Sequence, residues 1–323
     1  MFIACFEQSP EHPDYTSSVF KHSPVWIGGL GDRIVGLISC MLMAKLLNRK
    51  FYVLWTRDPI TRYVDFQQYT FTEQVLPPGV DITLHNSIDE QGAFRSYLME
   101  SENLYPEPIN IFYNNQEIAQ YIYKNKRFAH RNFLEDITAL YKTLYTDIMV
   151  PKTNVTSIAK RLLTNHQYIV GLQIRFGDYV IPEASQNRGN ERIYERSPED
   201  VLEKLVGIKE DLIKKGVYEQ CSIYLVSDFS QIELLTRQVF PKEKIIYFNR
   251  KIEHMDRTGN KRNMIKIFVD SYILSQKTNL LYLDRISNYG RIAGLSCPHD
   301  EIFDIDAQRL ERREILSKGE MIW

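Results

Sequence analysis

The sequence lacks several features that would place it in a common class of protein. Lys and Arg number 40 against 41 Asp and Glu, so the formal net charge is -1 and no basic excess indicates nucleic-acid binding. The longest apolar stretch, residues 34–47, is interrupted by Ser39 and Lys45 and is shorter than the roughly 20 residues of a membrane span. The N-terminal residues have neither a basic start nor a long apolar core, so no signal peptide is indicated. We therefore expect a cytoplasmic protein without nucleic-acid partners or membrane spans.

Common catalytic and metal-binding motifs are also missing. The sequence has no C-x-x-C, no H-E-x-x-H, no G-x-S-x-G and no G-x-x-x-x-G-K-[ST], and its seven histidines do not cluster. A D-x-D motif occurs only at residues 304–306, close to the C-terminus. Reduced, buried thiols are favoured for the four widely spaced cysteines, Cys5, Cys40, Cys221 and Cys297. We expect no bound metal and no cofactor.

Residues 25–55 contain the first clear pattern of secondary structure. An apolar run at 25–27 predicts a strand, and the glycine-rich residues 28–33 predict a turn. Apolar side chains at helical spacing predict a helix over 34–47, and the β-rich residues 51–55 predict a second strand. Strand, turn, helix and strand in this order predict a parallel sheet with helices on its faces.

A longer alternation of the same kind begins at residue 168. Strands are predicted at residues 168–174, 222–226, 244–248 and 279–283. Helices are predicted at residues 198–215, 231–239, 263–275 and from 287 onward. This alternation is typical of a doubly wound α/β domain, in which ligands bind outside the carboxyl ends of the strands.

The length of 323 residues predicts two domains, at roughly 150 residues each. We place an N-terminal α/β domain at 1–155, a Rossmann-like domain at 156–300 and a helical extension at 301–323. Two Rossmann-like domains facing a cleft are the GT-B architecture of nucleotide-sugar glycosyltransferases.

Several charged residues follow the predicted strand 168–174. Arg175 comes directly after the strand, where a guanidinium can pair bidentately with a diphosphate and neutralise the charge on a departing nucleotide. Asp178 can fix this arginine, although a purely structural Arg–Asp pair has the same pattern. Glu183 is positioned to act as a general base on an acceptor hydroxyl. The residue pattern alone favours the simpler interpretation that Glu183 is a solvent-exposed glutamate in a loop.

Three further segments carry polar groups at positions suited to a ligand. Ser227 and Asp228 end the strand 222–226. Asp270 lies on an apolar helix and needs donors, which the N1–H and N2–H groups of guanine would supply; a surface carboxylate is the alternative. Ser287 and Asn288 start a helix, where they suit either a phosphate or a simple N-cap.

The glycine-rich segment 28–33 is a further candidate. Glycines allow the backbone to approach a ligand, and the start of the following helix favours an anion. The segment does not match G-x-G-x-x-G, so a dinucleotide site is disfavoured. A tight turn between strand and helix is the alternative, although we expect Asp32 and Arg33 to be exposed charges that a plain turn would not need.

Four segments in order resemble the fucosyltransferase superfamily with a GT-B fold. This superfamily includes the α-1,2-, α-1,6- and protein O-fucosyltransferases and the rhizobial nodulation enzyme. GGLGDRIVGLISCMLMAKLLNRKFYVLW is similar to its glycine loop and following helix, and VGLQIRFGDY to its H-x-R-x-x-D element. IYLVSDFSQIELL resembles its strand ending in Ser/Thr-Asp. IFVDSYILSQKTNLLYLDRISNYGRIAGLS resembles its third element.

The resemblance implies an inverting, metal-independent transfer of fucose from GDP-fucose to a glycan hydroxyl. Arg175 would bind the donor diphosphate with support from Asp178, Asp270 would bind the guanine, and Glu183 would serve as base. The N-terminal domain would hold the acceptor, and the domain at 156–300 would hold the nucleotide sugar. If Glu183 is not the base, Asp32 is the alternative. The candidate catalytic residues are therefore Arg175, Glu183 and Asp32. The candidate donor-binding residues are Gly29, Gly31, Arg33, Gln173, Asp178, Ser227, Asp228, Asp270, Ser287 and Asn288.

The sequence departs from the family pattern at two positions. Gln173 stands where the family has a histidine, and Phe176 stands where it has a second arginine. Two alternatives therefore stay open. The first is a GT-B transferase that uses another nucleotide sugar, such as a UDP-sugar. The second is a non-catalytic member that binds a glycan or a nucleotide.

Overall fold

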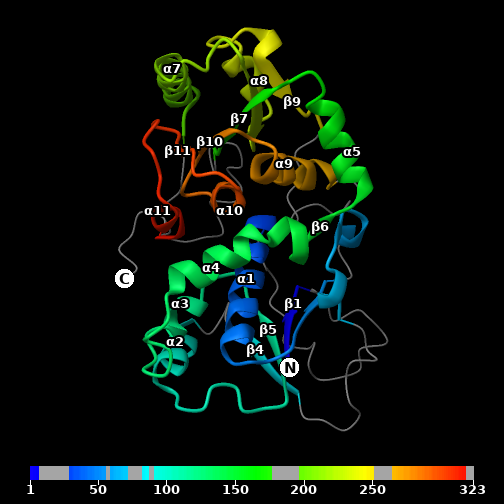
Figure 1. The fold of residues 1–323 in the computed structure, drawn as a ribbon, viewed down its shortest axis with the longest axis vertical. Helices are drawn as coiled ribbons and strands as arrows, with labels where there is room; N and C mark the ends of the chain where they lie inside the picture. The colour runs from blue at the N-terminus through cyan, green and yellow to red at the C-terminus, as the bar shows by residue number, and fades with distance from the viewer. Residues whose placement is uncertain are drawn as a thin grey trace. The chain divides into compact units, whose positions relative to one another are not determined.

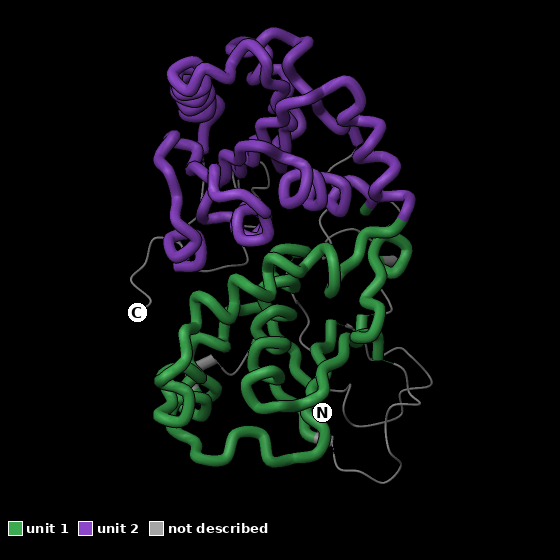
Figure 2. The backbone as a smooth tube through the Cα atoms, in the orientation of Figure 1, with its two compact units in different colours: residues 1–152, 254–264 green, residues 153–253, 265–323 purple. Residues whose placement is uncertain are grey.

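The structure, a computed structural model, describes residues 1–6, 29–55, 59–71, 82–86, 91–176, 196–250 and 264–317 (Figure 1). The chain divides into two compact units, which Figure 2 colours separately. Unit 1 comprises Met1–Lys152 and His254–Met264, and unit 2 comprises Thr153–Glu253 and Ile265–Trp323. None of the helices in the described ranges combines the length and apolar character needed to cross a membrane. All four cysteines are buried and free, as the sequence predicts.

Unit 1 is built on a parallel sheet with the strand order β2-β1-β5-β4. Its strands are β1 (Phe2–Cys5), β2 (Phe51–Leu54), β4 (Ile82–Asn86) and β5 (Ile109–Tyr113). β1 is wholly buried and lies between two partners, as is typical of a continuous apolar run in a parallel sheet. The sequence analysis did not predict this strand. The strand predicted at 25–27 lies outside the described residues.

Helix α1 (Leu30–Leu46) follows and packs on β1 (Figure 1). It begins four residues before the predicted start at residue 34, so the prediction that residues 30–33 form a glycine turn is wrong. Gly29 is the N-cap, and its backbone N–H donates to a carboxylate oxygen of Asp32 at 2.9 Å. This bond provides an acceptor for a backbone donor at the helix start, so the helix can begin inside the glycine-rich segment.

The rest of unit 1 surrounds this sheet and α1. The further elements are η2 (Pro59–Arg62), β3 (Val64–Asp65), η3 (Gln67–Tyr69), α2 (Gln91–Glu100), α3 (Ala119–Ile122), α4 (Phe133–Lys142), η5 (Leu144–Ile148) and β6 (Val150–Pro151). β3 and β6 pair in antiparallel fashion. α1 also holds the segment after β5, because its Ser39 hydroxyl accepts the backbone N–H groups of Ile118 and Ala119 at 3.0 and 2.8 Å.

Gly36 marks the closest approach of α1 to that segment. A Cβ at Gly36 would lie 1.9 Å from the carbonyl oxygen of Asn114, where neither backbone can give way easily. We expect Gly36→Ala to lower the free energy of unfolding of unit 1 by about 2 kcal/mol or more, measured by urea unfolding. Gly207→Ala is the matched control, since its Cβ meets nothing within 4 Å and the helix should gain about 0.5–1 kcal/mol. Equal stability of the two variants would contradict this packing.

Unit 2 is built on a five-stranded parallel sheet with the order β11-β10-β7-β8-β9. Its strands are β7 (Tyr168–Ile174), β8 (Cys221–Ser227), β9 (Ile245–Tyr247), β10 (Leu280–Leu283) and β11 (Ile302–Asp304). The first four follow the sequence prediction closely. β11 does not, because it adds a strand to the sheet from the stretch 301–323, which we expected to be a helical extension. Helix α11 (Arg312–Ser317) follows β11.

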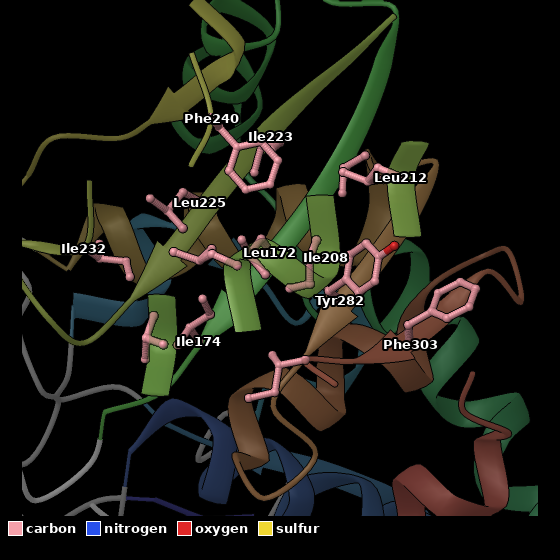
Figure 3. Packing of buried hydrophobic residues seen from close by; sticks show 14 of the residues in the cluster. Leu172, Ile174, Ile208, Leu212, Ile223, Leu225, Ile232, Phe240, Tyr282 and Phe303 are labelled. Atoms are coloured by element: carbon pink, nitrogen blue, oxygen red, sulfur yellow. The ribbon is translucent and has the colours of Figure 1, made fainter. Parts of the chain in front are cut away.

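Helices cover both faces of this sheet, so unit 2 is a doubly wound α/β unit, as predicted. They are α5 (Thr153–Leu162), α7 (Pro198–Lys214), α8 (Ile232–Thr236), α9 (Ile265–Gln276) and α10 (Asn288–Ser296). The buried face of α7 packs on the β7 side chains Val170, Leu172 and Ile174 (Figure 3). The intervening positions of β7 point to the other face, where α9 packs against α5 and α10. Ser197 caps α7 and Pro198 is its first residue, as predicted.

Candidate functional site

The carboxyl ends of the parallel strands bring several of the predicted residues together in unit 2. The strand register places Ile174 beside Ser227 and Gln173 beside Leu283. The edge formed by the ends of β7, β8 and β10 therefore carries most of the candidates that follow a strand, namely Gln173, Arg175, Ser227, Asp228, Ser287 and Asn288. Asp178 and Glu183 lie outside the described residues, so their roles stay predictions.

Arg175 is the most accessible of these side chains. It directly follows β7 and is exposed, and it has no hydrogen bond or ion pair to the residues that the structure describes. The backbone after it is fixed, because the N–H of Phe176 donates to a carboxylate oxygen of Asp228 at 2.7 Å. Phe176 itself is buried, and its ring lies 4.4 Å from that of Phe229. The end of β7 therefore presents one arginine outward from a rigid support.

Ser227 supports the neighbouring loop. Its hydroxyl accepts the backbone N–H of Phe229 at 3.2 Å, and its side chain is buried. In this arrangement Ser227 and Asp228 both hold backbone at the ends of β7 and β8.

Gln173 links three elements inside the protein. Its Oε1 accepts the backbone N–H of Asp284 at 3.1 Å, and its Nε2 lies 3.5 Å from the hydroxyl of Ser287. The side chain is buried, and a Cβ at Gly290 would come within 2.3 Å of its Oε1. Gln173, predicted to contact the donor, therefore joins β7 to the end of β10 and the start of α10.

The first turn of α10 is fixed by a side-chain cap at its N-terminus and by hydrogen bonds of Arg291. Ser287 is its N-cap, with the Gly290 N–H donating to the hydroxyl at 3.5 Å. The Asn288 Oδ1 accepts from the buried guanidinium of Arg291 at 2.7 Å. Arg291 also donates through Nε to the carbonyl of Ile315 at 2.7 Å, which ties α10 to α11. The N-cap alternative for Ser287 is thus realised, and a phosphate contact there stays a prediction.

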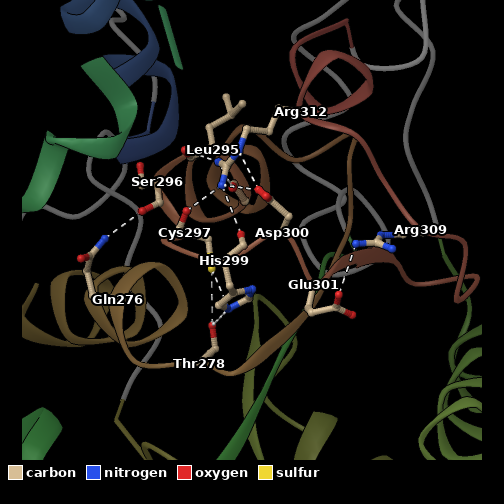
Figure 4. Close-up of polar contacts among 11 residues, drawn as sticks. Gln276, Thr278, Leu295, Ser296, Cys297, His299, Asp300, Glu301, Arg309 and Arg312 are labelled. Carbon is tan, nitrogen blue, oxygen red and sulfur yellow. Dashed lines mark hydrogen bonds and ion pairs between the residues drawn. The ribbon is translucent and has the colours of Figure 1, made fainter. Parts of the chain in front are cut away.

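The other end of α10 is fixed by Arg312 (Figure 4). Its guanidinium donates to the carbonyl oxygens of Gly294, Leu295, Cys297 and His299 at 2.8–3.2 Å. These bonds satisfy carbonyls that a helix leaves without intrahelical partners at its C-terminus. Arg291 and Arg312 together therefore hold α10 at both ends.

Cys297 and His299 form a close pair beside Arg312 (Figure 4). The Sγ of Cys297 lies 2.9 Å from Nε2 of His299, and the Thr278 hydroxyl lies 3.4 Å from the same nitrogen. Burial raises the pKa of the Cys297 thiol to about 11 and lowers the pKa of His299. The thiol therefore stays protonated at neutral pH, and this pair is not an activated nucleophile.

Asp270 is buried in a polar cluster between α9 and the sheet. Its Oδ1 accepts from the Tyr224 hydroxyl at 2.6 Å, and its Oδ2 lies 2.8 Å from Nζ of Lys266. Lys266 also donates to the carbonyl of Phe248 at 3.0 Å and lies 4.8 Å from the ring centre of Tyr247. Burial raises the pKa of Asp270, while Lys266 and Tyr224 act to lower it.

This cluster bears on the predicted role of Asp270. The alternative that Asp270 is a helix-surface carboxylate is wrong, since it is only 2% exposed. Its donors within the protein are a tyrosine from β8 and the lysine one helical turn before it. Guanine recognition by Asp270 stays a prediction, and a base would have to share these oxygens with both residues.

The remaining candidates belong to unit 1. Gly29 and Gly31 lie at the start of α1, and Asp32 is half-buried and bound to the Gly29 N–H. The expectation that Arg33 is an exposed charge is wrong, because it is 1% exposed and its guanidinium lies 5.4 Å from the ring centre of Trp55. Arg33 therefore belongs to the interior of unit 1.

Within the described ranges, no three or more histidine, cysteine or acidic side chains lie together so that they could hold a metal ion.

Comparisons with known proteins identify the fold. No family model and no curated protein sequence matches the chain. Among solved structures, the chain is similar to a variant of FUT1 from Arabidopsis thaliana in complex with GDP, with a TM-score of 0.59, 12% identity, and coverage of 94% of this chain and 69% of that chain. It is also similar to the alpha-1,6-fucosyltransferase NodZ soaked with GDP-fucose, with a TM-score of 0.52, 13% identity, and coverage of 85% and 91%. The fold is that of the GT-B fucosyltransferases. A further structure, the fucosyltransferase NodZ from Bradyrhizobium, matches with a TM-score of 0.51 and 14% identity over 85% and 91%.

Within this GT-B fold, sequence analysis missed four polar residues near the candidate site. Lys266 precedes Asp270 by one helical turn, so the predicted helix contained the signal for their pairing. Tyr224 meets Asp270 only through the packing of α9 on β8. Arg196 and Asp284 form an ion pair of 3.0 Å between the start of α7 and the end of β10. That pair joins segments 88 residues apart (284 − 196), which no local pattern relates.

Proposed function

We propose that the protein is an inverting, metal-independent glycosyltransferase that transfers fucose from GDP-fucose to a glycan hydroxyl. The observation that carries this proposal is the exposed Arg175 at the carboxyl end of β7. Parallel α/β sheets bind ligands at this edge. The similarity to fucosyltransferase structures that contain GDP or GDP-fucose supports the choice of donor.

The chemistry requires one bond to break and one to form at the anomeric carbon of the sugar. As the bond to the diphosphate oxygen breaks, negative charge grows on the departing GDP, and the Arg175 guanidinium stabilises it. A carboxylate, for which Glu183 is the candidate, takes the proton from the acceptor hydroxyl, whose oxygen bonds to the opposite face of the carbon. Since the guanidinium neutralises the leaving group, this scheme needs no metal ion.

Two alternatives have support of their own. Asp270 is occupied by Lys266 and Tyr224, which favours a transferase whose donor carries a base other than guanine. Phe176 is a core residue, so the position where the family has a second arginine supplies no positive charge. The loss of this charge is compatible with a protein that binds a nucleotide without transferring a sugar.

Calorimetric titration with GDP, UDP and ADP in the presence of EDTA separates these possibilities. We expect GDP to bind at least tenfold more tightly than UDP or ADP, without metal. Tighter binding of UDP than of GDP would mean that the donor is a UDP-sugar, and the protein would still be proposed to transfer a sugar. Binding of GDP without sugar transfer in an acceptor screen would favour the non-catalytic alternative. Failure to bind any of the three nucleotides would contradict the proposed function.

A further inference from the structure

We propose that unit 1 binds an acidic glycan on a cationic surface formed by Arg95, Lys124, Lys126 and Arg127. This inference deepens the proposed function, on which it rests for the choice of a glycan, because it names the chemical class of the acceptor. The surface lies on α2 and on the segment that follows α3, and none of its residues is among the candidates predicted from the sequence.

The segment 118–131 forms a series of three-residue turns. Five of its backbone N–H groups each donate to the carbonyl oxygen three residues earlier, at 2.9–3.1 Å, namely those of Tyr121, Lys124, Asn125, Phe128 and Arg131. In such turns, side chains three residues apart lie one above the other. One row is buried and consists of Ile122, Asn125 and Phe128. The neighbouring row leads from Tyr121 to Lys124 and Arg127, and both of these charged side chains are exposed.

The buried Asn125 holds this segment on the end of α2. Its Nδ2 donates to the carbonyl oxygens of Leu98 and Ser101 at 3.2 and 2.9 Å. Its Oδ1 accepts the backbone N–H of Arg127 at 3.1 Å. The backbone under the cationic surface is therefore fixed before any ligand arrives.

Tyr121 gathers charges from both α2 and the turns. The guanidinium carbon of Arg95 lies 5.1 Å from the centre of its ring, and Nζ of Lys124 lies 5.8 Å from the same point. α2 and α3 pack against each other, which brings Arg95 to this ring (Figure 1). Cations held by an aromatic ring lose less rotamer entropy when they bind an anion.

The positive charge of this surface is not balanced by nearby carboxylates. The sequence has no aspartate or glutamate between Glu117 and Glu135. Arg131 pairs with Asp136 at 3.0 Å. None of the four cations of the surface forms an ion pair with the residues that the structure describes. Exposed cations without carboxylate partners attract anionic ligands.

The surroundings favour a glycan over a membrane. The large apolar side chains that are exposed in the described ranges, Val206, Ile213, Leu234 and Ile286, all belong to unit 2. Within those ranges, unit 1 therefore offers no such side chain for insertion into lipid, which strengthens binding to a membrane surface.

The aromatic rings of the surface also favour a glycan over a nucleic acid. Single-stranded nucleic acids stack their bases on open aromatic rings. Phe128 is buried, and the ring of Tyr121 already has Arg95 and Lys124 beside it. An acidic glycan needs neither lipid insertion nor base stacking, because its anionic groups accept charge-assisted hydrogen bonds from lysine and arginine.

The double variant Lys124→Gln/Arg127→Gln tests this surface by calorimetry. The probes are an oligogalacturonate, its fully methyl-esterified form, which lacks the negative charges, and a heparin oligosaccharide. Lys160→Gln/Arg161→Gln is the matched control, since it removes the same two kinds of charge from exposed positions of α5 in unit 2.

We expect the unmodified protein to bind at least one of the two acidic probes and to bind the methyl ester much more weakly. The Lys124→Gln/Arg127→Gln variant should bind the acidic probe about tenfold or more weakly than the unmodified protein, because two charge-assisted contacts are lost. The control variant should keep its affinity. Urea unfolding should show equal stability of both variants, since all four replaced side chains are exposed.

Three results would overturn the inference. The first is failure of the unmodified protein to bind either acidic glycan. The second is an equal loss of affinity in both double variants, which would indicate general charge attraction. The third is tighter binding of single-stranded RNA or of phosphatidylserine vesicles than of both glycans, with dependence on Lys124 and Arg127, which would assign the surface to another partner.

Titration with GDP separates this inference from the proposed function. Both double variants should bind GDP as the unmodified protein does, because Arg175 and Asp270 belong to unit 2. Failure of the unmodified protein to bind GDP would contradict the proposed function and leave the binding of acidic glycans standing. Transfer of fucose to neutral glycans alone would support the proposed function and overturn this inference.

Discussion

Arg175→Ala is expected to reduce the rate of sugar transfer by about 10²-fold or more. The guanidinium is positioned to stabilise charge that develops on the departing nucleotide, so its loss raises the barrier to reaction more than it weakens ground-state binding. The measurement is kcat for transfer from GDP-fucose at saturating donor, with GDP affinity measured in parallel. A large fall in kcat with a smaller change in affinity is the signature of this role.

Two features allow this experiment to separate a loss of catalysis from a loss of folding. Arg175 is exposed and has no ion pair to the described residues, so its replacement should leave the fold intact, which circular dichroism verifies. Arg309→Ala is a matched control, because Arg309 is exposed in the same unit and pairs only at the surface with Glu301. Near-normal turnover of Arg175→Ala would show that the catalytic site has been misassigned.

Lys266→Met is expected to lower the free energy of unfolding of unit 2 by about 3–5 kcal/mol. Lys266 and Asp270 are 4% and 2% exposed, so removing the ammonium leaves a carboxylate buried beside Tyr224 without its charge partner. Urea unfolding followed by circular dichroism measures the change, and hydrogen exchange in α9 locates it. A loss below about 1 kcal/mol would mean that the pair contributes little, as surface pairs do.

The triple variant Lys266→Met/Asp270→Leu/Tyr224→Phe removes the ammonium, the carboxylate and the hydroxyl that pair with one another in this cluster. Replacing a whole buried ion pair with apolar residues is often neutral or stabilising, so we expect it to recover much of the lost stability. The affinity of this triple variant for GDP then tests whether Asp270 recognises the guanine base. A loss of GDP affinity of at least tenfold would support guanine recognition, whereas unchanged affinity would assign Asp270 to the fold alone.

Local patterns predicted much of unit 2. The cap Ser197 with Pro198 marked the start of α7, because both residues act through bonds and dihedral angles within one helical turn. The alternating apolar strands were found for a similar reason, since a buried parallel strand requires a continuous apolar run. The sequence also placed Arg175 and Asp228 at one edge of the sheet, because the carboxyl ends of neighbouring parallel strands lie together.

Unit 1 was harder to predict because its decisive contacts are distant in sequence. β1 has only four residues, and its place between β2 and β5 depends on partners about 50 and 108 residues away. The early start of α1 is a local effect of Asp32 that the glycines obscured. Arg33 was expected at the surface because its charge favours water, but α1 places it beside Trp55.

The sequence by itself determined the α/β class, the order of the strands and helices in unit 2, and the position of Arg175 after β7. These follow from hydrophobic period and capping, which act over a few residues. Only the tertiary structure decided that Gln173 faces Gly290, that Asp270 is bound by Tyr224 and Lys266, and that Asp284 holds Arg196. The physical reason is that these contacts depend on strand order and helix packing, which place residues from distant segments within hydrogen-bonding distance.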